Sequence, residues 1–110
     1  IARYQAADIV VNPSVSESFG ISMVEGMACG IPVVGATVGG MRETIVDGVT
    51  GSLVAPEDAE ALAGAIIDIW ADPVRARRMS EAGRARAVAM FSWRARASRI
   101  LTAYRALGAK

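Results

Sequence analysis

The chain has 110 residues, of which 53% are hydrophobic and 21% charged, and its formal net charge is +1. That is enough material for one compact domain and too apolar for a disordered tail. The absence of histidine excludes a Ser-His or Cys-His relay, and any histidine-bearing metal site, within these residues. The single cysteine, Cys29, excludes an internal disulfide and fits a reducing compartment.

The chain opens at Ile1 without a methionine, so we expect a piece of a longer protein or a trimmed product. No basic-then-apolar leader opens these residues, so they show no export signal, although residues before Ile1 could carry one. Its longest uncharged stretch, residues 26–41, contains several glycines and Pro32, so it cannot form one continuous membrane helix. We therefore expect a cytoplasmic protein.

Three short runs rich in β-branched residues predict buried strands at residues 8–12, 31–35 and 52–54. Helix-length segments at 20–29 and 41–46 separate them. This alternation is typical of a parallel sheet with crossover helices. We expect an α/β fold with a partial Rossmann-like parallel sheet of about three strands. The first strand would leave an open edge, as in the second half of a doubly wound domain.

The remaining residues predict a C-terminal helical extension. Asp58, Asp72 and Ser92 each precede a helical pattern as an N-cap, and Pro73 suits a first helical position. The helix that begins at Pro73 should run to about residue 90 with an interruption at Gly83.

Apolar side chains recur along two of these helices at helical spacing. The helix after Asp58 predicts a broad buried stripe, made of Leu62, Ala63, Ile66, Ile67, Ile69 and Trp70. The helix after Ser92 places a second set on one face, made of Trp93, Ala97, Ile100, Leu101, Tyr104 and Leu107. We expect Trp70, Trp93 and Tyr104 to be core residues.

The segment from residue 14 to residue 34 carries the chemistry. It leaves the carboxyl end of a strand, where open α/β sheets bind ligands, and then enters a helix. The backbone N–H groups of Gly20, Ile21 and Ser22 would be free at the first turn, where the helix dipole also favours an anion. A phosphate group is the expected occupant.

Two glutamates bracket this phosphate position. Ile21, Val24, Met27 and Ala28 share one arc that we expect to be buried, and Glu25 is expected at the edge of this stripe, one turn (about 5–6 Å) along the helix. That rise suits the step from a diphosphate to the hydroxyls of a ribose. Glu17, before the helix, could accept hydrogen bonds from whatever group the diphosphate carries.

The spacing of these acids carries a resemblance to a known family. Glu17 and Glu25 are separated by seven residues, and the flanking sequence reads Glu17-Ser18-Phe19-Gly20, then Glu25-Gly26-Met27-Ala28-Cys29-Gly30-Ile31-Pro32-Val33-Val34. This resembles the E-x7-E signature of retaining glycosyltransferase family 4, which has the GT-B fold. The resemblance continues through residues 39–51 and, more weakly, through the C-terminal helices.

The resemblance implies a role for each matching residue. Glu17 would be the catalytic residue of the pair and would contact the hydroxyls of the donor sugar. The backbone of Phe19 and Gly20 would line the sugar, and the amides of Ile21 and Ser22 would face the diphosphate. Glu25 would hold the ribose.

The same resemblance implies the partners of the protein. The co-substrate would be a nucleotide-diphosphate sugar, and the acceptor a glycan, lipid or small molecule that the residues do not identify. Neither a metal nor another cofactor is expected. Residues 1–56 would form the sheet with the donor loop and helix, and residues 57–110 the helices. An N-terminal acceptor domain would be missing, so we expect the fragment alone to be inactive.

Other interpretations of these residues stay open. Glu17 and Glu25 could be an ordinary loop acid and a solvated helix acid, or a glycoside-hydrolysing pair. The sequence lacks the G-x-x-x-x-G-K-[ST] and G-x-G-x-x-G motifs. Cys29 is interpreted as a small buried residue and Arg42 as a surface residue. The pair at 39–40 would supply permissive backbone angles before a helix, with a donor contact as the alternative.

Charge is distributed unevenly along the chain. Residues 1–72 hold two arginines against ten carboxylates (2 − 10 = −8), and residues 73–110 hold ten basic residues against Glu81 (10 − 1 = +9). The basic half could be a solvated face. Alternatively, residues 73–110 could be a non-catalytic module that docks on an anionic membrane surface, such as the inner face of the membrane, or, as the least favoured alternative, on nucleic acid. Few aromatic residues lie among the arginines, so no nucleic-acid partner is expected.

Overall fold

The structure is a computed structural model that describes residues 6–14 and 20–107. Its sheet has three parallel strands in the order β1-β2-β3, with bounds Val10–Asn12, Val33–Ala36 and Ser52–Val54. Val10 pairs with Val33, and Gly35 pairs with Leu53. The predicted partial parallel sheet is therefore confirmed. The first two strands begin later than expected: the N–H of Val10 donates to the carbonyl of Pro32 (3.0 Å), and ladder pairing starts there.

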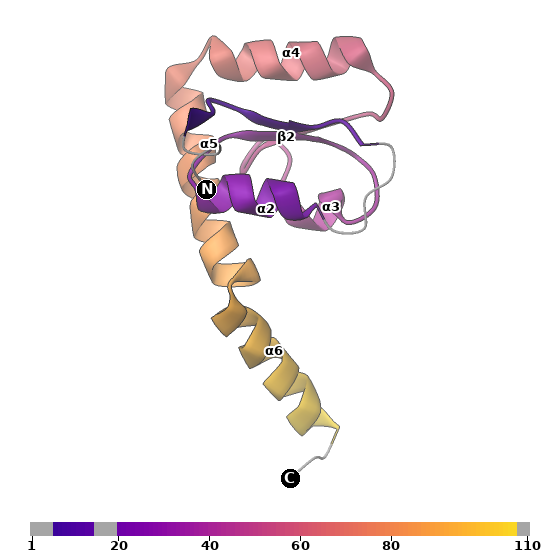
Figure 1. The fold of residues 1–110 in the computed structure, drawn as a ribbon, viewed down its shortest axis with the longest axis vertical. Helices are drawn as coiled ribbons and strands as arrows, with labels where there is room; N and C mark the ends of the chain where they lie inside the picture. Colours follow the sequence, from indigo (N-terminus) through magenta and orange to yellow (C-terminus); the bar gives the residue numbers. More distant parts are fainter. Residues whose placement is uncertain (1–5, 15–19, 108–110) are drawn as a thin grey trace.

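Helices cover the two faces of this sheet (Figure 1). Helices α2 (Ile21–Ala28) and α3 (Met41–Thr44) lie on one face, and α4 (Ala59–Trp70) lies on the other. Neighbouring side chains of a strand point to opposite faces. Val33 accordingly packs with Met23 and Met27, whereas Val34 packs with Ile69. The two valines thus anchor two separate hydrophobic clusters.

Three further helical segments follow, namely α5 (Pro73–Arg86), the π-helical segment η1 (Ala87–Phe91) and α6 (Trp93–Ala106). All three predicted N-caps are confirmed. Asp58 accepts from the N–H of Ala61 (2.9 Å), Asp72 from that of Arg75 (3.0 Å), and Ser92 from that of Ala95 (3.2 Å).

The predicted interruption at Gly83 is wrong, because α5 runs through this residue. Gly83 is buried, and a Cβ atom there would lie 3.3 Å from the carbonyl oxygen of Thr50 and 3.4 Å from Cγ of Met27. The glycine therefore lets α5 approach the body closely. The helical geometry changes further on, at η1.

The predicted buried face of α2 is also wrong. Met23, Gly26 and Met27 are buried, whereas Ile21 and Ala28 are exposed. The cause is Gly26, whose missing side chain allows close contact with the sheet. A Cβ atom at this position would lie 3.1 Å from methyl carbons of both Val10 and Val33.

The aromatic residues expected in the core lie at the surface. Trp70, Trp93 and Tyr104 are 68%, 82% and 61% exposed. On α4 only Ile69 is fully buried, and Ala63 and Ile67 are exposed with Trp70. Within the described residues, these stripes face no further sheet or helix that would cover them.

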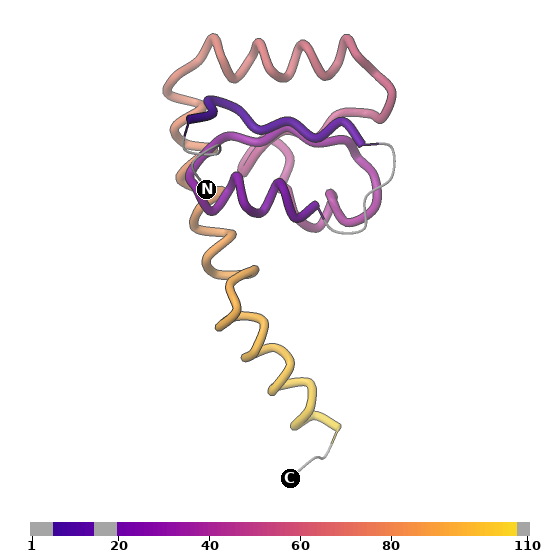
Figure 2. The backbone as a smooth tube through the Cα atoms, in the orientation of Figure 1, coloured from indigo at the N-terminus to yellow at the C-terminus, as the bar shows by residue number. Residues whose placement is uncertain are grey.

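The C-terminal helix extends away from the body of the molecule (Figure 2). The described structure is elongated, with extents of 53 × 26 × 23 Å, and none of the residues of α6 is buried. No helix within residues 6–14 and 20–107 is long and apolar enough to cross a bilayer.

Candidate functional site

The candidate site lies at the carboxyl end of β1, where the chain passes into α2. Gly20, Ile21, Ser22 and Glu25 are described there. Glu17 and Phe19, which the sequence also predicts for this site, lie outside the described residues. The structure therefore locates the part of the site that α2 carries.

Gly20 forms the N-cap of α2 in the left-handed region, with φ 82°. A Cβ atom at this position would lie 2.9 Å from Sδ of Met41, so both the backbone angle and the space favour glycine. The carbonyl of Gly20 accepts from the N–H groups of Met23 (3.0 Å) and Val24 (3.2 Å). The turn is thereby closed without any side-chain cap.

The first turn of α2 presents two open amides. Among the described residues, no acceptor meets the N–H groups of Ile21 and Ser22. The first turn also contains no acidic residue that would offset the positive end of the helix dipole. An anion at this position would find two hydrogen-bond donors and a favourable field.

Asn12 connects the strand end to this turn, and the sequence analysis missed it. Its Oδ1 accepts from the N–H (3.0 Å) and the hydroxyl of Ser14, so its Nδ2 is the donor to Oγ of Ser22 (3.2 Å). Because Oγ of Ser22 accepts this bond, its own proton is available to a ligand. The signal for Asn12 was its place at the last position of a predicted strand.

Glu25 is exposed one turn into α2. It lies on the same face as Ile21, four residues earlier, which is 63% exposed. The prediction that Glu25 borders the buried stripe is wrong, because the helix turns Gly26 toward the sheet instead of Ile21. The carboxylate thus lies on the solvent-facing side of α2.

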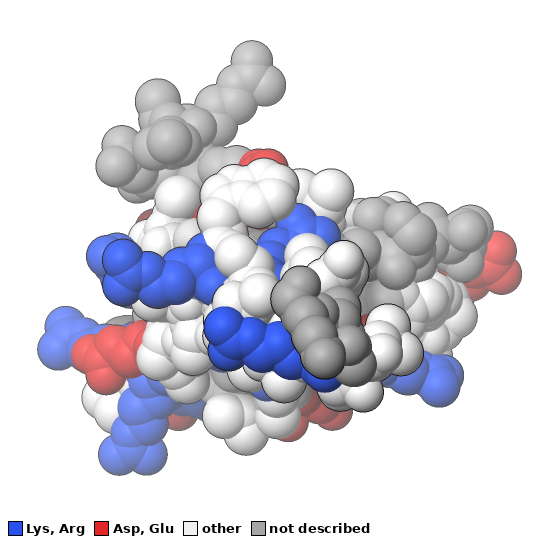
Figure 3. All heavy atoms as spheres, turned by 90° about the horizontal axis from the view of Figure 1, so that it is seen from below, with Lys and Arg blue, Asp and Glu red and all other residues white. Residues whose placement is uncertain are grey.

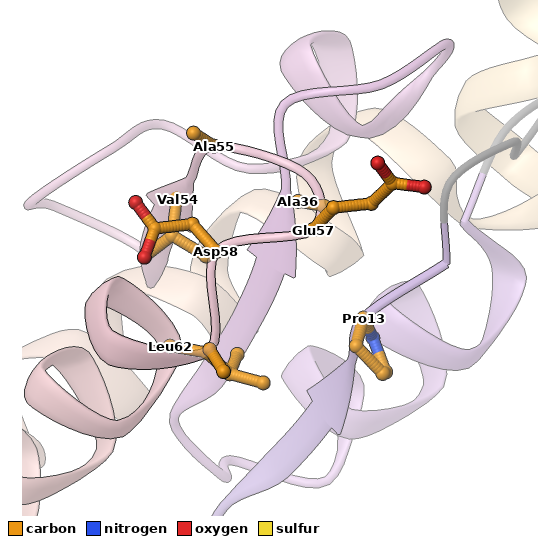
Figure 4. Close-up of a pocket in the computed structure, with 8 residues that line it drawn as sticks. Pro13, Ala36, Val54, Ala55, Glu57, Asp58 and Leu62 are labelled. Atoms are coloured by element: carbon orange, nitrogen blue, oxygen red, sulfur yellow. The ribbon is translucent and has the colours of Figure 1, made fainter.

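A hollow of about 260 Å³ lies at the same carboxyl edge, on the α4 side of the sheet (Figure 4). Its lining is mostly apolar and comprises Pro13, Ala36, Val54, Ala55, Glu57, Asp58, Ala59 and Leu62. In Figure 4 the carboxylates of Glu57 and Asp58 point to opposite sides. Glu57 has φ 58°, a left-handed angle that is uncommon for a side-chain-bearing residue. No motif or pattern in the sequence indicates this hollow.

Three other residues for which the sequence made predictions lie around α2 and α3. Gly39 has φ 48° before α3, which confirms its role in backbone geometry. Arg42 is exposed, as predicted, and donates to the carbonyl of Thr37 (3.5 Å). Cys29, expected to be buried, is a half-buried free thiol at the C-cap of α2. Over the described ranges, His, Cys, Asp and Glu form no cluster of three that could hold a metal ion.

This combination of a parallel sheet, helices on both faces and a helix N-terminus at the carboxyl edge is typical of an open α/β domain, which binds ligands at that edge. The sequence matches the family described as "Glycosyl transferases group 1" over residues 1–86. The chain belongs to this family, and its solved structural neighbours have the GT-B fold.

Among curated relatives, the D-inositol 3-phosphate glycosyltransferase of Segniliparus rotundus is 47% identical over 103 residues, covering 94% of this chain and 23% of the relative. The Mycobacterium bovis protein of the same name is 46% identical over 105 residues, covering 93% and 22%. The chain therefore spans about a quarter of the length of these relatives.

Solved structures also match nearly the whole of this chain. Sucrose-phosphate synthase from Thermosynechococcus elongatus superposes with a TM-score of 0.87 at 47% identity, covering 96% of this chain and 26% of that one. Anabaena HepE in complex with UDP superposes with a TM-score of 0.88 at 30% identity, covering 94% and 29%. The same Anabaena protein has also been solved with UDP-glucose.

Proposed function

We propose that this chain is the C-terminal portion of the donor-binding domain of a retaining glycosyltransferase of family 4. The observation that carries the proposal is the open first turn of α2, which lies at the carboxyl edge of the sheet. It is found in a chain that matches glycosyl transferases group 1. Residues 1–56 supply the sheet with the donor loop and helix, and residues 57–110 supply the supporting helices. The acceptor-binding domain belongs to the rest of the enzyme, so the fragment alone is inactive.

The proposed donor is a nucleotide-diphosphate sugar, and its diphosphate meets the first turn of α2. The amides of Ile21 and Ser22 donate to phosphate oxygens, and Oγ of Ser22, oriented by Asn12, adds a third donor. Gly20 allows the ligand to approach the backbone closely, and the backbone of Phe19 lines the sugar with it. The complexes of Anabaena HepE with UDP and UDP-glucose support this class of ligand.

Glu25 is proposed to bind the ribose. It is exposed and lies one turn, about 5–6 Å, along the helix from the phosphate position, which suits the step from diphosphate to ribose. Its carboxylate can accept from both ribose hydroxyls. Glu17, on the other side of the phosphate position in the sequence, is proposed as the residue that contacts the sugar hydroxyls.

In the proposed reaction, the bond between the anomeric carbon and the diphosphate oxygen breaks. A bond to the oxygen of an acceptor hydroxyl then forms on the same face of the sugar, and the proton of that hydroxyl passes to the departing diphosphate oxygen. Negative charge grows on the departing diphosphate, next to the amides of Ile21 and Ser22. Donors fixed at the position where charge develops stabilise a transition state more than a ground state. We propose that this step needs no metal, as the resemblance implies.

Donor binding tests the site in the full-length enzyme. Glu25→Ala should weaken the binding of UDP-glucose, the probe, by about 1.5–3 kcal/mol, or roughly 10- to 150-fold in Kd, because hydrogen bonds to a charged group are lost. Glu17→Ala should mainly reduce turnover. Glu81→Ala, which removes an exposed carboxylate on α5, is the matched control. Unchanged binding and transfer in both site variants would refute the assignment.

Product analysis tests the reaction class separately. The anomeric configuration of the donor sugar should be kept in the product, as measured by NMR of an early time point. Transfer should persist after treatment with EDTA. An inverted product would overturn the retaining assignment, and an activity lost with EDTA and restored by a divalent cation would overturn the metal-free one.

Two other interpretations receive less support. Glycoside hydrolysis requires two carboxyl groups facing one scissile bond, whereas the family match is to transferases. A purely non-catalytic basic module does not account for the match over residues 1–86, because that range includes the donor helix.

A further inference from the structure

Asn12 contacts residues on both sides of the segment that joins β1 to α2. Its Oδ1 accepts from the N–H (3.0 Å) and from the hydroxyl of Ser14. Its Nδ2 donates to Oγ of Ser22, in the first turn of α2 (3.2 Å). Glu17 lies between Ser14 and Ser22 in the sequence. One amide side chain therefore links the residues that precede and follow the predicted sugar-binding acid.

These contacts determine the orientation of the Asn12 amide. The backbone N–H of Ser14 can only donate, so the atom that meets it is the amide oxygen. The amide NH2 group is thereby directed at Ser22, where Oγ must act as the acceptor. The hydroxyl proton of Ser22 consequently points away from Asn12.

The hydroxyl of Ser22 differs from other hydroxyls on the helices of this chain. Thr44, Ser80 and Thr102 each donate to the carbonyl four residues earlier, at 3.0, 2.7 and 2.9 Å. Ser22 is the second residue of α2, so the residue four positions earlier precedes the helix. Within residues 6–14 and 20–107, its hydroxyl donates to no carbonyl. The half-buried hydroxyl of Ser22 is therefore a donor that a ligand can use.

Most of the positive charge of this chain lies elsewhere. Ten of its twelve basic residues follow Asp72, and Figure 3 shows basic side chains spread over the face that is seen from the end of α6. Neither β1 nor α2 contains a basic residue. The donors that these two elements present at the first turn of α2 are therefore uncharged. Such hydrogen bonds weaken steeply when donor and acceptor are misaligned, so the direction of each donor matters.

We propose that Asn12 is a positioning residue of the donor site, which aims the hydroxyl proton of Ser22 at the diphosphate of the nucleotide sugar. The inference rests on the proposed function and deepens it, because it makes a residue outside α2 responsible for a phosphate contact. A free hydroxyl rotates to suit any partner. The bond from Nδ2 of Asn12 restricts that rotation before the ligand arrives, so less freedom is lost on binding.

Binding of UDP and of uridine to the full-length enzyme tests the proposal, because uridine lacks both phosphates. Ser22→Ala should weaken UDP binding roughly 10- to 150-fold, the loss of one hydrogen bond to a charged group. Asn12→Ala should weaken it about three- to tenfold, because the hydroxyl remains but loses its neutral partner. Binding of uridine should stay unchanged in both variants. Isothermal titration calorimetry gives each Kd.

The double variant distinguishes positioning from two independent effects. With Ser22 already replaced by alanine, Asn12→Ala should cause little further loss of UDP binding, because the group that it positions is gone. Ser22→Thr keeps a hydroxyl and should bind UDP nearly as tightly as the unmodified enzyme. Ser80→Ala is the matched control, since it removes a half-buried helical hydroxyl that is bonded within α5. It should leave UDP binding unchanged.

Asn12→Asp keeps the test decisive if Asn12→Ala fails to fold. Its carboxylate can still accept from Ser14, but it cannot donate to Ser22. It draws the hydroxyl proton of Ser22 toward itself, so UDP binding should fall at least as far as in Asn12→Ala. Thermal unfolding of each variant shows which of them remain folded under the conditions of the titration.

Four results would overturn the role of Asn12. These are unchanged UDP binding in Ser22→Ala, additive losses in the double variant, equal losses for UDP and uridine, and full UDP binding in Asn12→Asp. If Glu25→Ala still weakens UDP binding in such a case, the proposed function stands and only the role of Asn12 is lost. If Glu25→Ala also leaves UDP binding unchanged, the donor site is wrong and this inference falls with it.

Discussion

Helices α2 and α6 differ in where their apolar residues lie. Helix α2 has eight residues and no side-chain cap, yet Met23, Gly26 and Met27 are buried. Helix α6 has fourteen residues, a Ser92 cap and basic Arg105 in its last turn, yet none of its residues is buried. The exposed helix α6 therefore has the stronger local helix signals, namely a side-chain cap and a basic last turn, whereas the partly buried helix α2 has neither. Local signals establish that a helix forms, whereas its packing depends on the surface it meets.

Removing a core side chain should have the largest effect. Met27 is fully buried between the sheet and α5, so Met27→Ala should lower the free energy of unfolding by about 2–5 kcal/mol. Ile100→Ala, the counterpart on α6, should change it by less than about 0.5 kcal/mol, because Ile100 is 69% exposed. Urea unfolding followed by circular dichroism measures both. Equal losses would mean that α6 packs on the body in solution.

Changing the N-cap of α2 should have an intermediate effect. Gly20 has φ 82° and Gly30 has φ 72°, but only at Gly20 would a Cβ atom meet a neighbour, Sδ of Met41 at 2.9 Å. Gly30→Ala should cost about 1–2 kcal/mol for the left-handed angle, and Gly20→Ala should cost at least as much. Thermal unfolding measures the free energy of unfolding of both variants, and the difference between Gly20→Ala and Gly30→Ala is the cost of the Met41 contact. A smaller cost at Gly20 than at Gly30 would contradict this geometry.

Removing the cap of α6 should have the smallest effect on the body. Ser92→Ala deletes the bond to the N–H of Ala95 and should weaken α6 by about 1 kcal/mol. Amide exchange should accelerate within α6 only, because no residue of α6 is buried. Asp58→Ala on α4, which carries the buried Ile69, is the comparison and should lower the stability of the whole domain. Faster exchange throughout the domain in Ser92→Ala would show that α6 supports the body.

Much of the fold could be predicted from the sequence. The strand at residues 52–54, the caps Asp58, Asp72 and Ser92, and the start of α2 after Gly20 agree with the structure. The caps depend on interactions between residues close in sequence, such as a cap oxygen and an amide three positions later. The open amides of Ile21 and Ser22 could be predicted for the same reason.

Other features could not be predicted from neighbours in the chain. The bond from Asn12 to Ser22 spans ten residues, and the hollow at the carboxyl edge gathers residues from 13 to 62. Sequence reasoning assigned Ile21 to the core and gave Gly26 no packing role. In the structure the glycine is buried and the isoleucine exposed, because close approach to Val10 and Val33 requires the smallest residue.

The sequence alone determined which segments form strands and helices, where the helices begin and where charge accumulates along the chain. Those properties follow from backbone angles, local hydrogen bonds and residue counts. The tertiary structure decided which faces are buried, since burial depends on which surfaces meet and how closely. It placed α2 against the sheet through Gly26 and left Trp70, Trp93 and Tyr104 exposed on stripes that the described residues do not cover.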